Sequence, residues 1–137
     1  MTVTRTPRPG VATVEFAVVS SAALLFVIGL IVGALGVFRY QEVARLAREG
    51  ARYASVRGDS YANATGRPAA TPDDVHQQAI LPNAVILDPS KLTSAVTWDP
   101  DKRVGATVTV RVSYVWIPET IFPPVTMSCS AAQQVSY

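Results

Sequence analysis

A glycine and a glutamate stand five residues apart at the edge of a long apolar stretch. Gly10 ends a short basic leader, and Glu15 lies five residues later, just before an uncharged run from Phe16 to Phe38. A cut after Gly10 would give Val11 a free ammonium group, about one helical turn, or roughly 6 Å, from Glu15 along a helix axis. In lipid, pairing with such an amine, in the same chain or in a neighbour, would offset the cost of an ionised carboxylate.

Two simpler interpretations of Glu15 stay open. The carboxylate could lie at the level of the lipid head groups, where it needs no buried partner. It could also sit near the N-terminus of a helix, where the helix dipole favours an acidic side chain.

The apolar run has the length of a membrane span. Phe16 to Phe38 is 23 residues, which as a helix measures roughly 34 Å and crosses a hydrocarbon core with some tilt. A removable signal peptide is an alternative, because Ala34-Leu35-Gly36 is a small-x-small sequence, but such peptides have a shorter apolar region. A secreted protein cut near Gly36 is therefore one competing hypothesis.

Small residues recur within the span at spacings of four or eight, and Gly29 and Gly33 form a GxxxG sequence. Small side chains let helices approach closely in lipid, so this stripe is a candidate helix-packing face. The alternative is that glycine is simply frequent in membrane helices. The residues of this stripe are Ala17, Ser21, Gly29 and Gly33.

Beyond Phe38 the pattern becomes amphipathic, which predicts that the helix continues outside the membrane. One helix from about Val11 to Arg57 follows, with Gly58 as its stop. Arg45 and Glu49, and Glu49 and Arg52, have the spacing of ion pairs. The apolar stripe of this second half comprises Tyr40, Val43, Ala44, Ala47, Ala51 and Ala54.

The remaining residues, 59–137, predict a small domain. Residues 58–70 have the composition of a loop, and Thr71-Pro72-Asp73-Asp74 begins a short helix that runs to about Leu81. Strand-like segments follow at 84–87, 92–98, 104–116 and 125–137, separated by short turns that favour antiparallel pairing. The predicted fold is α+β: a long N-terminal helix, transmembrane and then amphipathic, packed on a small antiparallel sheet.

Composition and charge exclude several classes of function. Residues 1–58 carry seven arginines against three glutamates, and the positive charge flanks the span, which suits lipid head groups better than nucleic acid. His76 stands alone, on the surface of the short helix, and Cys129 falls on the inner face of the last strand as a buried thiol. Because no cluster has metal-ligand or catalytic spacing, we expect no metal, no cofactor and no enzyme activity.

Three segments of the first half of the chain carry a resemblance to a known family. They are Gly10 to Ala17 (GVATVEFA), Gly36 to Tyr40 (GVFRY) and Ala47 to Ala54 (AREGARYA). They resemble the TadE-like family, pseudopilin-like components of tight-adherence (Flp) pilus systems in bacteria, over about residues 8–58. Two departures are Ser21, about where the family often has proline, and Phe16, where major Flp pilins tend to have tyrosine.

The resemblance implies a pilin-like fold and a defined topology. Gly10 and Val11 would flank the cut of a membrane prepilin peptidase, residues 1–10 would be a cytoplasmic leader, and Glu15 would help dock the subunit. Residues 11–58 would form the long helix, and residues 59–137 a domain outside the cytoplasmic membrane. The implied partners are other pilin-like subunits, the pilus assembly platform, the peptidase and the bilayer. The competing hypothesis from another class is an uncleaved, membrane-anchored binding module.

Overall fold

The computed structural model describes residues 9–118 and 123–136, so the leader at 1–8 and the predicted inner position of Tyr137 lie outside the described residues. The chain divides into two compact units, Met1–Gly36 and Val37–Tyr137. We refer to the second unit as the head. The prediction of a long N-terminal helix with a small antiparallel sheet, an α+β arrangement, is confirmed.

Helix α1, Pro9–Ser55, contributes to both units. It begins two residues before the predicted start and ends two residues before the predicted end at Arg57. From Ala12 to Ile31 every residue is exposed, although nearly all are apolar. Over the described residues, one helix is long and apolar enough to cross a membrane, and its most apolar window buries nothing inside the protein. A helix that is apolar all round needs an apolar environment, which lipid supplies.

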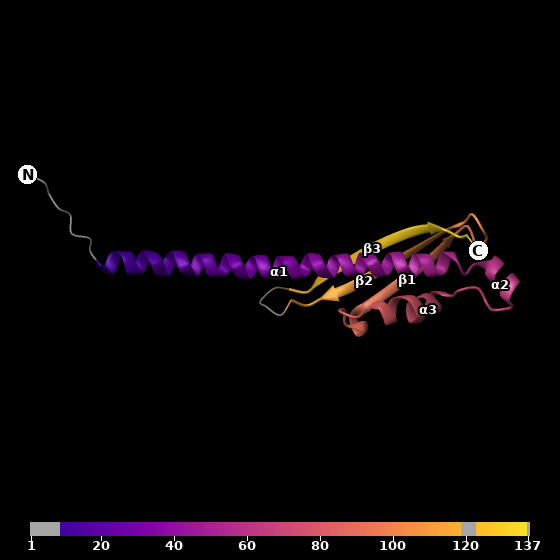
Figure 1. The fold of residues 1–137 in the computed structure, drawn as a ribbon, viewed down its shortest axis with the longest axis horizontal. Helices are drawn as coiled ribbons and strands as arrows, with labels where there is room; N and C mark the ends of the chain where they lie inside the picture. Colours follow the sequence, from indigo (N-terminus) through magenta and orange to yellow (C-terminus); the bar gives the residue numbers. More distant parts are fainter. Residues whose placement is uncertain (1–8, 119–122, 137) are drawn as a thin grey trace, which may run out of the picture. The chain divides into compact units, whose positions relative to one another are not determined.

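The sheet of the head has three antiparallel strands in the order β1-β2-β3, with β2 in the centre (Figure 1). Strand β1 is Leu92–Asp99, β2 is Thr107–Trp116 and β3 is Val125–Gln134. The register pairs Val96 with Val110 and Val110 with Ala131, so the predicted inner positions of all three strands share one face. The start of β2 was predicted too early, because Gly105 takes a positive φ of 92° and turns the chain before Thr107.

The core of the head lies between this inner face and the second half of α1. Val108, Val110 and Val112 of β2 are fully buried, as is Val43 of α1. The prediction that the amphipathic stripe covers the sheet is therefore confirmed for most of its members. Two members are exceptions: Tyr40, because half of its surface stays exposed, and Ala44, which is half-buried. The other members of the stripe that are buried are Ala47, Ala51 and Ala54.

Gly50 is a point of close approach between α1 and the rest of the core. A Cβ atom at this position would lie 3.0 Å from Cγ1 of Val110, and 3.4 Å from both Cδ1 of Ile80 and Cγ1 of Val75. Glycine costs a helix about 1 kcal/mol relative to alanine. The structure gives that cost a reason, since a side chain here would collide with the central strand.

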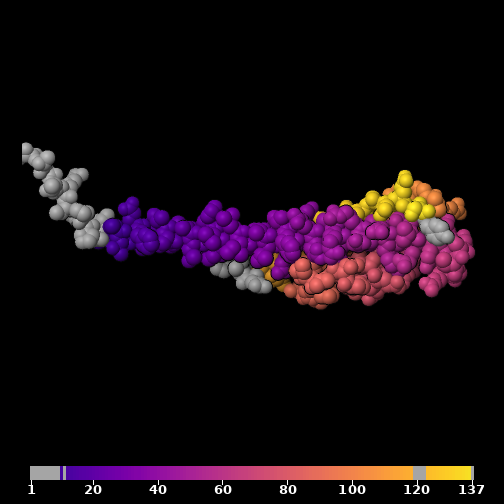
Figure 2. Space-filling model, viewed as in Figure 1, coloured from indigo at the N-terminus to yellow at the C-terminus, as the bar shows by residue number. Residues whose placement is uncertain are grey.

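The segment before the sheet is more helical than predicted. Residues Asp59–Thr65 form helix α2, where a loop was expected, and Gly66 ends it in the left-handed conformation with a φ of 68°. The predicted short helix is confirmed: it begins as α3, Pro72–Asp74, and continues as a π-helix, η1, Val75–Ile80, and a 3-10 turn, η2, Leu81–Asn83. Figure 2 shows this segment packed along the second half of α1.

Two predictions in this segment were wrong. The run at 84–87 is not a strand: Ala84 and Leu87 are buried while Val85 and Ile86 are exposed, in a bend before the 3-10 turn η3, Pro89–Lys91. His76 is half-buried rather than on the surface, and its Nδ1 lies 2.8 Å from Oγ of Ser94. That contact ties η1 to β1.

Candidate functional site

The predicted processing site lies in the first turns of α1. Gly10 and Glu15 are both exposed, and nothing approaches within 4 Å of a Cβ built on Gly10. Because α1 begins at Pro9, Glu15 falls outside its first turn, where the helix dipole acts most strongly. The dipole interpretation of Glu15 is therefore weakened for the uncut chain. A new terminus at Val11 would place Glu15 about one turn from the ammonium group.

The predicted packing stripe spreads over more than one face of α1. At about 100° per residue, Gly29 and Gly33 lie about 40° apart, whereas Ala17 lies about 120° from Gly29. The same helix geometry brings Ala22 and Gly36 to within about 20° of Gly29. It places Glu15 at about the same angle as Gly33. A narrow face that includes the acid therefore holds four small residues together with Val18. Its residues are Glu15, Val18, Ala22, Gly29, Gly33 and Gly36.

The two serines of the span need no partner outside their own helix. Oγ of Ser20 donates to the carbonyl of Ala17 at 3.1 Å, and Oγ of Ser21 donates to the carbonyl of Val18 at 2.9 Å. Satisfied in this way, both hydroxyls are tolerated in lipid. Gly29 and Gly33 are also open, because nothing lies within 4 Å of a Cβ built on either. The face is therefore free to receive another helix.

The neck of the head, defined here as Arg39 and Tyr40, is held by the sheet. The guanidinium of Arg39 lies 5.5 Å from the centroid of the Trp116 ring, and its Nη1 is 3.5 Å from the hydroxyl of Tyr114. Tyr40 lies beside the thiol of Cys129, and that contact raises the pKa of the Tyr40 hydroxyl. Cys129 faces inward as predicted but is only half-buried. These contacts attach the first residues of α1 within the head to the sheet.

One turn further along α1, Arg45 forms an ion pair within the helix and a hydrogen bond to the segment that contains Asn83. Arg45 pairs with Glu42, with Nε at 3.0 Å from Oε2, and its Nη2 donates to the carbonyl of Asn83 at 2.7 Å. The hydrogen bond from Arg45 lowers the pKa of Glu42. Neither of the two pairs whose spacing would allow contact, Arg45–Glu49 and Glu49–Arg52, is an ion pair in the structure. The three ion pairs of the described residues are Glu42–Arg45, Asp88–Lys91 and Asp101–Arg103.

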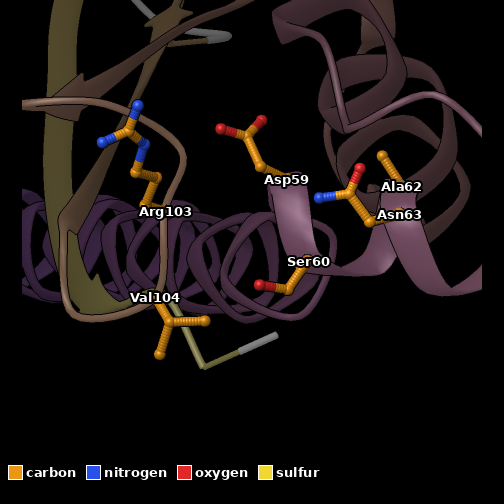
Figure 3. Close-up of a pocket in the computed structure, with 6 residues that line it drawn as sticks. All are labelled: Asp59, Ser60, Ala62, Asn63, Arg103 and Val104. Atoms are coloured by element: carbon orange, nitrogen blue, oxygen red, sulfur yellow. The ribbon is translucent and has the colours of Figure 1, made fainter.

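The surface of the head has open hollows. The one drawn in Figure 3 has a volume of about 650 Å³ and lies between α2 and the turn that precedes β2. Asp59 and Arg103 stand on opposite walls, but Arg103 already pairs with Asp101 at 3.3 Å. Within residues 9–118 and 123–136, no group of three or more His, Cys, Asp or Glu side chains could hold a metal ion.

A second hollow lies beside the edge strand β3. Its volume is about 340 Å³, and it combines Arg48 and Arg52 of α1 with small residues of β3. The outer edge of β3 carries no further strand in the described sheet, so its backbone could pair with an added strand. The small lining residues are Ala51, Ala131 and Ala132.

Comparison with known proteins found one family that resembles part of the chain. Residues 10–52 match the model of the TadE-like protein family. The match begins at the predicted processing glycine and ends just beyond Gly50, so it contains Glu15, the apolar span and the neck. Searches among curated proteins and among solved structures returned no match. The TadE-like segment supports a component associated with tight-adherence pili, and the family is one of pilus structural or assembly components.

Two features of the TadE-like segment were missed by sequence reasoning. The close approach at Gly50 was not predicted, although a glycine kept in mid-helix against its propensity cost was a usable signal. The Arg39–Trp116 contact could not have been found, because 77 residues separate the partners and no pattern links them.

Proposed function

We propose that the chain is a minor pilin or pseudopilin of a tight-adherence (Flp) pilus, adhesion or secretion apparatus. The observation that supports this most directly is that residues 10–52 match the TadE-like family and form one helix whose apolar first part is exposed. An exposed apolar helix joined to a folded head would allow a subunit to stay inserted in the membrane and then to pack with other pilin-like subunits. Residues 16–38 would span the cytoplasmic membrane once.

The proposed topology follows from processing. A prepilin peptidase acting at the cytoplasmic face would remove residues 1–10 and leave Val11 as the first residue. The head would then lie outside the cytoplasm. Glu15 would pair with the new amine of Val11, in its own chain or in a neighbour, and the pair would be worth more in lipid than at a wet surface.

Assembly would use the small-residue face of α1. Helices associate in lipid through close packing, which small side chains permit. Because Glu15 shares this face with Gly29 and Gly33, docking of the acid and packing of the glycines would occur against the same neighbour. The proposed partners are other pilin-like subunits and the assembly platform in the membrane.

The test is co-isolation of the full chain with other pilin-like subunits, from envelopes of a bacterium that carries a complete tight-adherence system. Replacing Gly29 and Gly33 by leucine keeps the span apolar but fills the face, so we expect co-isolation to fall severalfold. The control is Ala34→Leu, which adds one leucine side chain about 140° around the helix from Gly29. Equal recovery of both variants and the unaltered chain would refute assembly through this face.

A further inference from the structure

The end of the head where β2 stops and β3 starts differs in chemistry from the opposite end. We propose that this end rests in the lipid head-group layer, with Ile117 and Val125 against the upper acyl chains. The proposal assumes the membrane span put forward above and adds a lipid contact made by the head itself. We call this end of the head the lower rim.

The height of the lower rim is set by Arg39. This residue directly follows Phe38, the last residue of the apolar run, so it marks where the chain leaves the hydrocarbon core. The guanidinium of Arg39 lies 5.5 Å from the Trp116 ring and 3.5 Å from the Tyr114 hydroxyl. The end of β2 is therefore held at the level where the helix enters the head groups, and Val125 is at the same level because it pairs with Trp116.

The side chains of the lower rim suit that environment. Tyr40, which is half exposed, belongs to the residue types that gather at membrane interfaces, because its ring is apolar and its tip is polar. Trp116 and Tyr114 are buried. Around them, apolar side chains are exposed among the residues that the structure describes. The exposed apolar residues at this end are Val37, Phe38, Val115, Ile117 and Val125.

The opposite end of the sheet has a different composition. The turn between β1 and β2 carries four charged residues in five positions, Asp99 to Arg103. Along β2 the two ends are about ten residues, or roughly 33 Å, apart. The opposite end also exposes Val104, but next to this charged turn, whereas the lower rim exposes Val115, Ile117 and Val125. A second copy of the chain could also cover the lower rim, but lipid is favoured because Arg39 ties the rim to the residue at which the span ends.

The experiment uses two exposed valines at opposite ends of the sheet. Val125 is 43% exposed and Val104 is 58% exposed. Each is changed to cysteine in a Cys129→Ser background, labelled with an environment-sensitive fluorophore, and studied as the full chain in phosphatidylcholine–phosphatidylglycerol vesicles. We expect the label at 125 to emit at shorter wavelength and to be quenched by lipids brominated near the top of the acyl chain. The label at 104, although on the more exposed residue, should emit as in water and resist quenching.

The amount of protein per lipid distinguishes the two occupants. A spectral shift at 125 that is unchanged when the protein is diluted in lipid supports the bilayer contact. A shift that disappears on dilution would identify a second copy and overturn the proposal, as would an emission at 125 that matches the one at 104. Flotation of the same samples separates this failure from failure of the span, because a chain that floats with vesicles is still anchored.

Native tryptophans give a second measurement that needs no label. Trp98→Phe leaves Trp116 at the lower rim, and Trp116→Phe leaves Trp98, which pairs with Val108 near the far end. Brominated lipid should quench the first variant and spare the second. Equal quenching of both variants, or none in either, would contradict the proposal.

Discussion

Replacing Gly50 by alanine tests how tightly α1 is packed on the sheet. The new methyl group would lie 3.0 Å from Cγ1 of Val110, closer than carbon atoms normally approach. Val110 is fully buried in the central strand, and its β-branched side chain has little rotamer freedom. Ile80, on the other side of the glycine, is also fully buried. The neighbours therefore cannot move aside without disturbing the whole core.

The sign of the effect depends on two opposed contributions. Alanine would favour the helix by about 1 kcal/mol over glycine. Overpacking of a well-filled core costs about 1–3 kcal/mol, and here the contact is with two fully buried side chains. We therefore expect Gly50→Ala to lower the free energy of unfolding of the head by about 1 kcal/mol, which corresponds to a fall in Tm of about 4–8 °C.

The assay is unfolding of the full chain in detergent micelles, followed by tryptophan fluorescence from the head. Gly29→Ala is the matched control, because it is also a mid-helix glycine but its Cβ would meet nothing within 4 Å. A double-mutant cycle with Val110→Ala removes the colliding methyl group, so the double variant should be more stable than the two single effects predict, by about 1 kcal/mol. An increase in stability for Gly50→Ala, matching helix propensity alone, would refute the close approach.

Three further predictions concern the contacts that hold the head together. Arg45 lowers the pKa of Glu42, so the ion pair stabilises the folded state above pH 4.5, and this stabilisation is lost as the pH falls through the lowered pKa. Glu42→Gln should therefore flatten this part of the pH profile of Tm. An unchanged slope would contradict the assignment. Arg39→Ala should lower the free energy of unfolding by about 0.5–1 kcal/mol and shift the emission of Trp116. Arg39→Lys should keep part of the stabilising contact with the ring, so its loss should be smaller. Identical behaviour of the two variants would argue against the stacked contact. Thr71 and Asp74 form a capping box. Thr71→Ala should therefore lower the free energy of unfolding by about 1 kcal/mol and speed amide exchange in residues 72–80, whereas Thr71→Ser should restore protection. Equal exchange in all three proteins would refute the cap.

The long helix and the sheet could be predicted because their patterns repeat over many residues. Alternation from Val108 to Trp116 defines one buried face, and the register places every inner position of the three strands together. The amphipathic stripe after Phe38 predicted which side of α1 covers that face. In both cases the pattern reflects which side chains are buried, and the spacing of apolar residues in the sequence indicates this directly.

The parts that could not be predicted depend on single contacts between distant residues. Helix α2 is short and contains no buried residue, so its sequence lacks the periodic apolar pattern from which a helix is predicted. The run at 84–87 has the composition of a strand, but only its first and last residues are buried, and it bends over the core instead. Arg45 pairs with Glu42 rather than with Glu49, and its guanidinium also donates to the carbonyl of Asn83. That second partner lies 38 residues away in the sequence, so the spacing within the helix could not indicate it.

Most of the candidate functional site was predicted from residue types and spacing in the first fifty residues. Gly10, Glu15 and the glycines of the span were identified in this way, and the family match covers all of them. The narrow face that unites Glu15 with Gly29 and Gly33 needed the angle between residues, because a constant spacing of four turns steadily around a helix. Cleavage and docking at this site stay predictions.

The central claim is that this chain is matured and assembled as a pilin-like subunit. Its most direct test is the intact mass and N-terminal sequence of the membrane-bound protein, made with and without a prepilin peptidase. The account predicts a start at Val11 that appears only when the peptidase is present. An N-terminus near Met1, in cells where the peptidase is shown to process its own pilin, would contradict the claim and favour an uncleaved, membrane-anchored binding module.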